Sequence, residues 1–246
     1  MVNYLYDSSF EGLLTSIYEA YYRRETPNHI FPYNYIQQSL IDSNIHIATN
    51  LEKASKVYES IHRKISYQAL KNVYHAYLSE LNDIEIIILN YLKLGFKKGK
   101  EIDLHLSEDN VLAIHTAAKK VTREAHLMLG LLRFKQLENN IYYAQYKPDH
   151  NITTLISSHF VNRFSDQYWV IHDLKRHYAA VFDKNSCVFT DISEQKILSS
   201  LNNNDNYEKL WKNYFTNICI TERINPKQQK NYMPKRYWNF LTEKQL

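Results

Sequence analysis

The stretch IYYAQYKPDHNITTLISSHFVNRFSDQYWVIHD, residues 141–173, decides the fold class of this sequence. Its first six residues (Ile141–Tyr146) and its last six (Tyr168–Asp173) are β-rich runs of strand length. Between them, residues 151–164 carry apolar side chains at helical spacing. Residues 176–182 form a hairpin with the second run, and residues 186–191 predict one more strand. The stretch therefore predicts a β-α-β-β-β unit.

Most of the chain outside this unit is predicted to be helical. Ser8 and Glu11 predict a capping box for the first helix, and Asn50 predicts the cap of the second. The amphipathic helices are expected at residues 10–21, 51–65, 70–78, 84–94, 107–137 and 210–220. The other expected elements are short strands at residues 3–6 and 45–48 and a loop at residues 23–34.

These elements predict an α+β protein that is predominantly helical, with a small, mostly antiparallel sheet in its C-terminal half. We expect a helical N-terminal region with a short strand over residues 1–106. Residues 107–246 are expected to hold the long helix, the sheet and a basic C-terminal tail. The two regions are predicted to pack as one compact unit.

Composition excludes some classes of protein and leaves others open. With 4 Gly in 246 residues, neither of the Gly-rich phosphate-binding loops of nucleotide enzymes occurs. The 21 Tyr have two explanations, codon drift in an AT-rich genome or a surface that stacks bases. A net charge of +4 is mildly basic, and the cations cluster near the C-terminus. The cluster fits a polyanionic partner, although a solvated tail would have the same composition.

Sequence features that relate to cellular compartment favour the cytoplasm. Two Cys residues without a C-x-x-C motif fit a reducing compartment. The N-terminus lacks the basic and apolar regions of a signal peptide. Residues 84–94 are apolar, but they include charged side chains and are too short to span a bilayer. We therefore expect a cytoplasmic protein without a membrane partner.

The predicted long helix carries a basic ridge. At about 100° per residue, one side of the helix collects Lys119, Arg123, His126 and Arg133. Gly130 lies within this ridge and leaves room for a ligand to approach the backbone. The ridge is therefore a candidate anion-binding surface, or else an ordinary solvent-exposed face.

The helix at residues 151–164 places His159 and Arg163 on its apolar face. A buried arginine needs an acceptor, and strand alternation brings Trp169 and Asp173 to one face of the following strand. Arg163 and Asp173 could form a buried ion pair. Alternatively, His159 and Arg163 could flank a pocket floored by Trp169, with Arg176 near it, that binds an anion or a base. In that pocket His159 and Asp173 would be the candidate catalytic residues.

The C-terminal tail mixes cations with aromatic residues. Arg223 is a candidate anion-binding residue, and Tyr237 and Trp238 are candidate stacking residues. They could cover a nucleic-acid strand, or they could simply dock the tail. The histidines match no metal-ligand spacing, so no metal and no other cofactor is expected.

Four segments of the chain resemble a known family. They are YLYDSSFEGLLTSIYEAYYRRE at residues 4–25, KVTREAHLMLGLLRF at 120–134, YKPDHNITTLISSHFVNRFSDQYWVIHDLKR at 146–176 and RINPKQQKNYMPKRYW at 223–238. The chain resembles a bacterial family of predicted DNA metabolism or repair proteins of unknown biochemistry. Its members are typically encoded beside a radical-SAM protein, and in some a similar domain is joined to a uracil-DNA glycosylase domain. The resemblance covers essentially the whole chain, more loosely between Asn44 and Asp109.

The resemblance implies DNA as the target of the pathway and a radical-SAM protein as the partner. It carries over to a set of residues that overlaps the candidates above: Arg123, His126, Arg133, His159, Arg163, Trp169, Asp173, Arg176, Arg223, Met233, Pro234, Tyr237 and Trp238. The water-activating glycosylase motif G-Q-D-P-Y is absent from the sequence, so glycosylase activity is not assigned to this chain.

The sequence thus favours a nucleic-acid-binding accessory protein of DNA repair or modification. In this hypothesis the basic ridge binds phosphates of DNA, including single-stranded DNA, and an aromatic side chain stacks a base. Two alternatives remain open. One is a nucleotide- or DNA-processing enzyme, with His159 as general base and Arg163 and Arg176 on a phosphate. The other is a scaffold for the radical-SAM partner.

Overall fold

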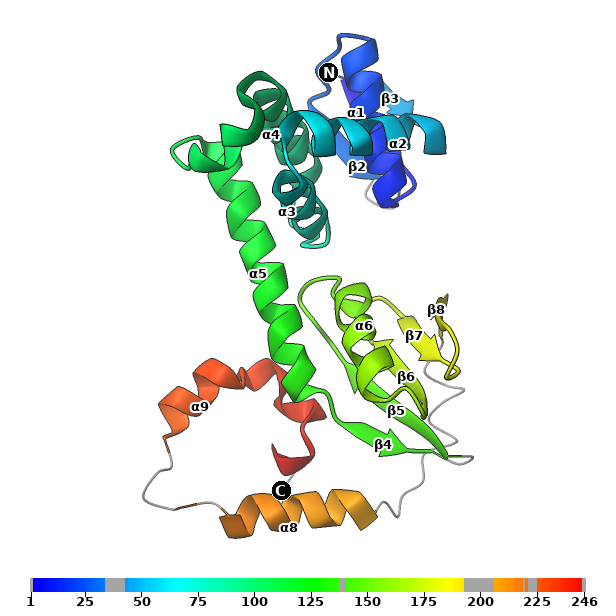
Figure 1. Cartoon of the computed structure of the whole chain (residues 1–246), viewed down its shortest axis with the longest axis vertical. Helices are drawn as coiled ribbons and strands as arrows, with labels where there is room; N and C mark the ends of the chain where they lie inside the picture. The colour runs from blue at the N-terminus through cyan, green and yellow to red at the C-terminus, as the bar shows by residue number, and fades with distance from the viewer. Residues whose placement is uncertain are drawn as a thin grey trace. The chain divides into compact units, whose positions relative to one another are not determined.

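A computed structural model describes residues 2–33, 43–137, 140–192, 206–218, 220 and 225–244, with the backbone alone for residues 206–209. The chain forms two compact units, Met1–Thr122 and Arg123–Leu246 (Figure 1). The boundary between them falls inside helix α5 (Asp109–Leu131), whereas the sequence placed it just before that helix, at residue 106. Each unit has its own β-sheet.

The N-terminal unit contains a three-stranded parallel sheet in the order β2-β1-β3. The strands are β1 (Val2–Tyr6), β2 (His29–Pro32) and β3 (Ser43–His46). Tyr4 in the central strand pairs with Ile30 on one side and Ile45 on the other. Strand β2 lies in the segment that the sequence predicted as a loop. It is an edge strand that ends at a proline, and edge strands are where sheets tolerate proline.

The helices of this unit are α1 (Phe10–Tyr22), α2 (Leu51–Ser60), α3 (Tyr67–Tyr77), α4 (Ile84–Lys98) and the first part of α5. A π-helical turn, Ile61–Ile65, follows α2, and a 3-10 segment, Gly99–Leu104, follows α4. The Asn50 side chain caps α2 by accepting from the Lys53 N–H at 3.0 Å, as predicted. Helix α1 is capped by Ser9 rather than Ser8, because Ser8 has a positive φ of 66° and lies outside the helix. One apolar core joins the sheet to the helices.

The C-terminal unit is built on a five-stranded sheet in the order β4-β5-β6-β7-β8. The strands are β4 (Phe134–Gln136), β5 (Ile141–Tyr146), β6 (Tyr168–Asp173), β7 (Tyr178–Phe182) and β8 (Cys187–Asp191). Strands β5 and β6 are parallel, with α6 (Thr153–Arg163) as their crossover, and the other neighbours are antiparallel (Figure 1). The predicted α+β class and the mostly antiparallel sheet are confirmed.

Strand β4 corrects the predicted extent of the long helix. The sequence extended that helix to residue 137, but α5 ends at Leu131 and the chain then turns into β4. Arg133 stabilises this end, because its guanidinium donates to the Gly130 carbonyl at 2.8 Å, one of the carbonyls that the last helical turn leaves free. Phe134 then pairs with Ala144 of β5. This change of direction brings the end of α5 beside the sheet.

The other described elements of this unit are α8 (Asn206–Ile218), α9 (Pro226–Tyr232) and two 3-10 segments, Lys235–Phe240 and Thr242–Lys244. The described part of the basic tail therefore consists largely of short helical segments. Asn225 caps α9 by accepting from the Gln228 N–H at 3.0 Å, and proline occupies the first helical position. Among the described residues, no helix combines the length and apolar character needed to cross a membrane.

Candidate nucleic-acid interface

An open groove of about 700 Å³ lies in the C-terminal unit. Its walls are the end of α5, the start of β4 and the last turns of α6. The basic ridge contributes His126 and Arg133, and α6 contributes His159 and Arg163. The aromatic residues that line it are Phe134, Phe160, Phe164 and Tyr232. Two groups of residues that the sequence treated as separate candidates thus meet in one groove, and none of the described residues lining it is acidic.

His159 and Arg163 face this groove because the buried face of α6 differs from the predicted one. The sequence placed both side chains among buried apolar residues, but the structure exposes both. The buried face includes two hydroxyl-bearing residues, Thr153 and Ser157. Their hydroxyls are satisfied internally, by Tyr146 at 2.8 Å and by the Thr153 carbonyl at 2.5 Å. Because these small side chains are hydrogen-bonded, they can occupy the buried face of the helix, and His159 and Arg163 lie at the surface.

The charge of Arg163 is available to a ligand. No carboxylate pairs with it in the part of the chain that the structure describes, and its guanidinium lies 5.9 Å from the centre of the Phe164 ring. Lys119 and Arg123 lie on earlier turns of α5 and are exposed, and neither lines the groove. Lys119 belongs to the N-terminal unit. The C-terminal end of the basic ridge, with His126 and Arg133, therefore lines the groove.

Gly130 forms part of the groove wall and is exposed. A Cβ atom added to it would meet no atom within 4 Å, so the space above its backbone is open. The predicted close approach of a ligand to the helix backbone is therefore sterically possible at this position.

Arg133 forms an ion pair with a buried acid in the tail. Its Nε and Nη2 donate to both oxygens of Glu243, at 3.1 and 2.6 Å, in a bidentate pair. Glu243 also accepts from the Trp211 indole N–H of α8 at 3.0 Å. Burial alone would raise the pKa of Glu243, but these donors outweigh it and lower the pKa. Arg133 thus joins the groove to α8 and the tail, and its charge is largely neutralised.

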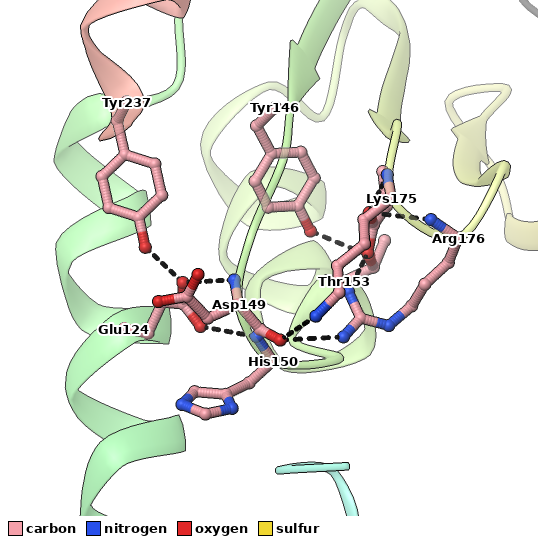
Figure 2. Close-up of polar contacts among 9 residues, drawn as sticks. Glu124, Tyr146, Asp149, His150, Thr153, Lys175, Arg176 and Tyr237 are labelled. Carbon is pink, nitrogen blue, oxygen red and sulfur yellow. Dashed lines mark hydrogen bonds and ion pairs between the residues drawn. The ribbon is translucent and has the colours of Figure 1, made fainter. Parts of the chain in front are cut away.

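Tyr237 is not a stacking residue, because its ring is 1% exposed. Its hydroxyl donates to the buried carboxylate of Glu124 on α5, which also accepts from the backbone N–H groups of Asp149 and His150, at 2.8 and 2.9 Å (Figure 2). Burial, and then the hydrogen bond to Glu124, raise the pKa of Tyr237 far above its ordinary value. The alternative in which this tyrosine docks the tail is the one the structure shows. We call Glu124 and its three donors the Glu124 clasp.

Asp173 pairs with Arg176, not with Arg163. Its side chain is fully buried and accepts from the Arg176 guanidinium at 2.8 Å. Arg176 also donates to the Asp149 carbonyl, as does Lys175, so the pair holds the turn after β6 against the loop that contains the clasp (Figure 2). Burial raises the pKa of Asp173, against the opposing effect of Arg176. His159 and Asp173 do not form the expected catalytic pair, because Asp173 is enclosed and His159 is exposed.

The remaining candidates fall outside the groove. Trp169 is 0% exposed and packs between Phe160 and Phe182, so it cannot stack a ligand base. Trp238 is half-buried, donates to the Met233 carbonyl at 2.7 Å and has lysine side chains near its ring. Arg223 lies outside the described residues. Among those described, no three His, Cys, Asp or Glu side chains gather as metal ligands would.

Two residues that organise the site were missed from the sequence, Glu124 and Glu243. A signal for Glu124 was present, because it follows Val121 by three positions and precedes Met128 by four, on the core stripe of α5. An acid on a buried stripe demands donors. Glu243 had a weaker signal, as a lone acid among the clustered cations of the tail.

The fold and the groove define an α+β protein with a cationic, aromatic-lined surface groove. A family model described as a domain of unknown function, DUF4130, matches residues 82–243. Because this match spans more than half of the 246 residues, the chain belongs to that family. It includes every residue of the groove, the clasp and the Glu243 pair. No curated protein matches the chain.

Proposed function

We propose that this protein binds nucleic acid as an accessory protein of DNA repair or modification, and that the groove receives the phosphate backbone. One observation carries the proposal: His126 and Arg133 of the basic ridge and His159 and Arg163 of α6 converge on one groove with no described acid in its lining. The DNA context comes from the family resemblance of the sequence.

The chemistry of the groove fits a phosphodiester. The exposed guanidinium of Arg163 offers a planar set of donors that matches phosphate oxygens. His126 and His159 add nitrogen atoms from the two facing helices. The aromatic lining gives sugars and bases an apolar surface. A small, highly charged anion would use the cations but leave the aromatic surface unoccupied.

Arg163→Gln tests the proposal. The substitution removes a charge that no described carboxylate balances, so folding should be unaffected. We expect weaker binding of a fluorescein-labelled 20-nucleotide strand, measured by anisotropy from 50 to 300 mM salt. Loss of one phosphate contact on a single strand should reduce the slope of log affinity against log salt by about 0.7.

The matched control is Arg63→Gln. Arg63 is 77% exposed in the N-terminal unit and makes a long ion pair at 3.6 Å. Its loss changes the net charge by the same amount as Arg163→Gln does. If both variants weaken binding to the same extent, the effect is one of net charge and the groove has no special role. Unchanged affinity and salt slope in Arg163→Gln would refute the proposal.

The proposed partner is a radical-SAM protein, and the support for it is the family resemblance alone. Deleting the tail would be a poor test, because it removes Tyr237 and Glu243, which are bonded inside the unit. Charge reversal of exposed Lys227 and Lys230 on α9 is a gentler perturbation. Co-purification of the full chain with the partner, weakened by these reversals, would support a complex. Failure of the unaltered proteins to co-purify would refute it.

A hydrolytic activity is the second candidate, and a specific observation favours it. His126 and His159 line the same groove as Arg163, so a phosphate there would have two potential proton-transfer groups beside it. This pairing replaces the His159–Asp173 pair expected from the sequence. Turnover of an oligonucleotide that is lost in both His126→Ala and His159→Ala, with binding retained, would establish it. No turnover by the purified protein would exclude hydrolysis by this chain alone.

A further inference from the structure

Helix α8 carries an exposed pair of stacked aromatic rings. The Trp211 and Tyr214 ring centres are 5.7 Å apart with an interplanar angle of 18°. Trp211 is 40% exposed and Tyr214 is 55% exposed. An exposed aromatic ring does not gain the free energy of leaving water, and a ligand that covers the ring would supply that gain. Neither residue was a candidate from the sequence.

A hydrogen bond to a buried side chain fixes the orientation of the Trp211 ring. Its indole N–H donates to Glu243, the same buried carboxylate that holds Arg133. Glu243 is 1% exposed, so a desolvated acid positions both side chains. A ring held in this way loses little side-chain entropy when a ligand stacks on it. Trp211 therefore has the rigidity expected of a residue in a binding platform.

Arg133 connects this platform to the groove. It lines the groove, and its guanidinium carbon lies 5.4 Å from the centre of the Trp211 ring. The platform and the groove therefore share one side chain as a common border. A chain-like ligand that places its backbone in the groove would reach the platform with a neighbouring group.

The chemistry around the platform favours a base over an apolar protein segment. From Leu210 to Ile218 helix α8 has no acidic residue. Together with Arg163 in the groove, whose charge no described carboxylate pairs, this surface complements a polyanion whose units also carry planar rings. Nucleic acid is a polymer with both properties.

We propose that Trp211 and Tyr214 stack an unpaired base, and that the ligand of the groove is single-stranded nucleic acid. The inference rests on the proposed function and narrows it. In a duplex, base faces are covered by their neighbours, so only an unpaired base can extend the Trp211–Tyr214 stack. The phosphates lie along the groove, and the adjoining base lies on the platform.

Tyr214→Ala is the decisive variant, because it removes half of the platform and leaves the Trp211–Glu243 hydrogen bond in place. The full chain is titrated with a labelled twelve-nucleotide oligothymidylate, an abasic strand of equal length and a duplex of equal length. Alanine substitution of a stacking residue corresponds to an affinity loss of roughly 5- to 150-fold. We expect at least about fivefold for the thymidylate. The abasic strand, with the same charge, should bind the variant and the wild type alike.

Tyr168→Ala is the matched control. Tyr168 is 45% exposed in the same unit, on β6, and does not line the groove, so its loss should leave affinity unchanged. Equal affinity of the wild type for the thymidylate and the abasic strand would overturn the stacking proposal. Tighter binding of the duplex would overturn it too. In both cases an Arg163→Gln effect would leave the proposed function standing, whereas no binding of any strand would overturn both.

Tryptophan fluorescence gives a second readout. The chain has three tryptophans, of which Trp169 is fully buried. We expect the oligothymidylate to quench emission in the wild type and in Trp238→Phe, but much less in Trp211→Phe. Quenching that persists in Trp211→Phe and disappears in Trp238→Phe would assign stacking to the tail and overturn the proposal.

Discussion

The Glu124 clasp makes a quantitative prediction about the C-terminal unit. In Glu124→Gln the side chain keeps its shape but loses its charge and exchanges one acceptor oxygen for an NH₂ donor. The Oε1 atom accepts from Tyr237 and from the Asp149 N–H, and Oε2 accepts from the His150 N–H. The amide can keep the first two bonds only by turning its NH₂ group toward the His150 N–H. At least one buried donor then loses its acceptor.

The magnitude follows from these three bonds. A hydrogen bond to a charged group contributes about 1.5–3 kcal/mol, and one between neutral groups about 0.5–1.5 kcal/mol. Losing one charged bond and weakening two, offset by relief of a buried charge, should destabilise the unit by about 2–4 kcal/mol. At a urea dependence of about 2 kcal/mol per molar, the unfolding midpoint should fall by about 1–2 M.

The assay can address this unit selectively, because all three tryptophans lie in it. Urea unfolding followed by tryptophan emission therefore reports the C-terminal unit. Tyr237→Phe removes one of the three donors and should lower the midpoint by less than Glu124→Gln does. Asp166→Asn exchanges an exposed carboxylate for an amide in the same unit and should change nothing. A Glu124→Gln midpoint equal to that of wild type would refute the reasoning, as would a larger effect of Tyr237→Phe.

Two further predictions follow from the groove and its border. The pKa of Glu243 is lowered in the folded protein, so ionised Glu243 stabilises the fold at pH values above its usual pKa near 4.5. This stabilisation is lost as the pH falls through the lower pKa of the folded state. Glu243→Gln should therefore lower the urea midpoint at pH 7, and the gap from wild type should shrink at pH 3.5; a gap independent of pH would contradict the assignment. Gly130→Ala should be neutral or stabilising by up to about 1 kcal/mol, because the new Cβ meets no atom within 4 Å and alanine favours helix. Gly130→Leu should fold equally well but weaken oligonucleotide binding by protruding into the groove, and equal affinities of the two variants would show that the ligand does not approach this backbone.

Much of the secondary structure was determined by local sequence. Strands β5 and β6 begin and end at the predicted residues, and Asn50 caps α2 as predicted. These elements depend on β-propensity and on short-range hydrogen bonds, which neighbouring residues specify. The basic ridge of α5 was also predictable, because helical periodicity alone gathers Arg123 and His126 on one exposed side.

Elements whose stability depends on distant partners were not predictable in this way. Strands β2 and β4 have four and three residues, and each exists through pairing with a longer neighbour. The predicted buried face of α6 was wrong because the hydroxyl groups of Thr153 and Ser157 form hydrogen bonds inside the unit. A polarity pattern counts such side chains as exposed, whereas satisfied hydrogen bonds allow their burial.

The same distinction between local sequence and long-range packing applies to the candidate site. By itself, the sequence determined the fold class, the cationic side chains and the family to which the chain is similar. Only the tertiary structure decided which of them share a groove, which are neutralised and which are sealed in the core. Arg133 and Glu243 are 110 positions apart, and Glu124 and Tyr237 are 113 apart. At such separations no local pattern encodes the pairing, since it is set by the packing that brings the two segments together.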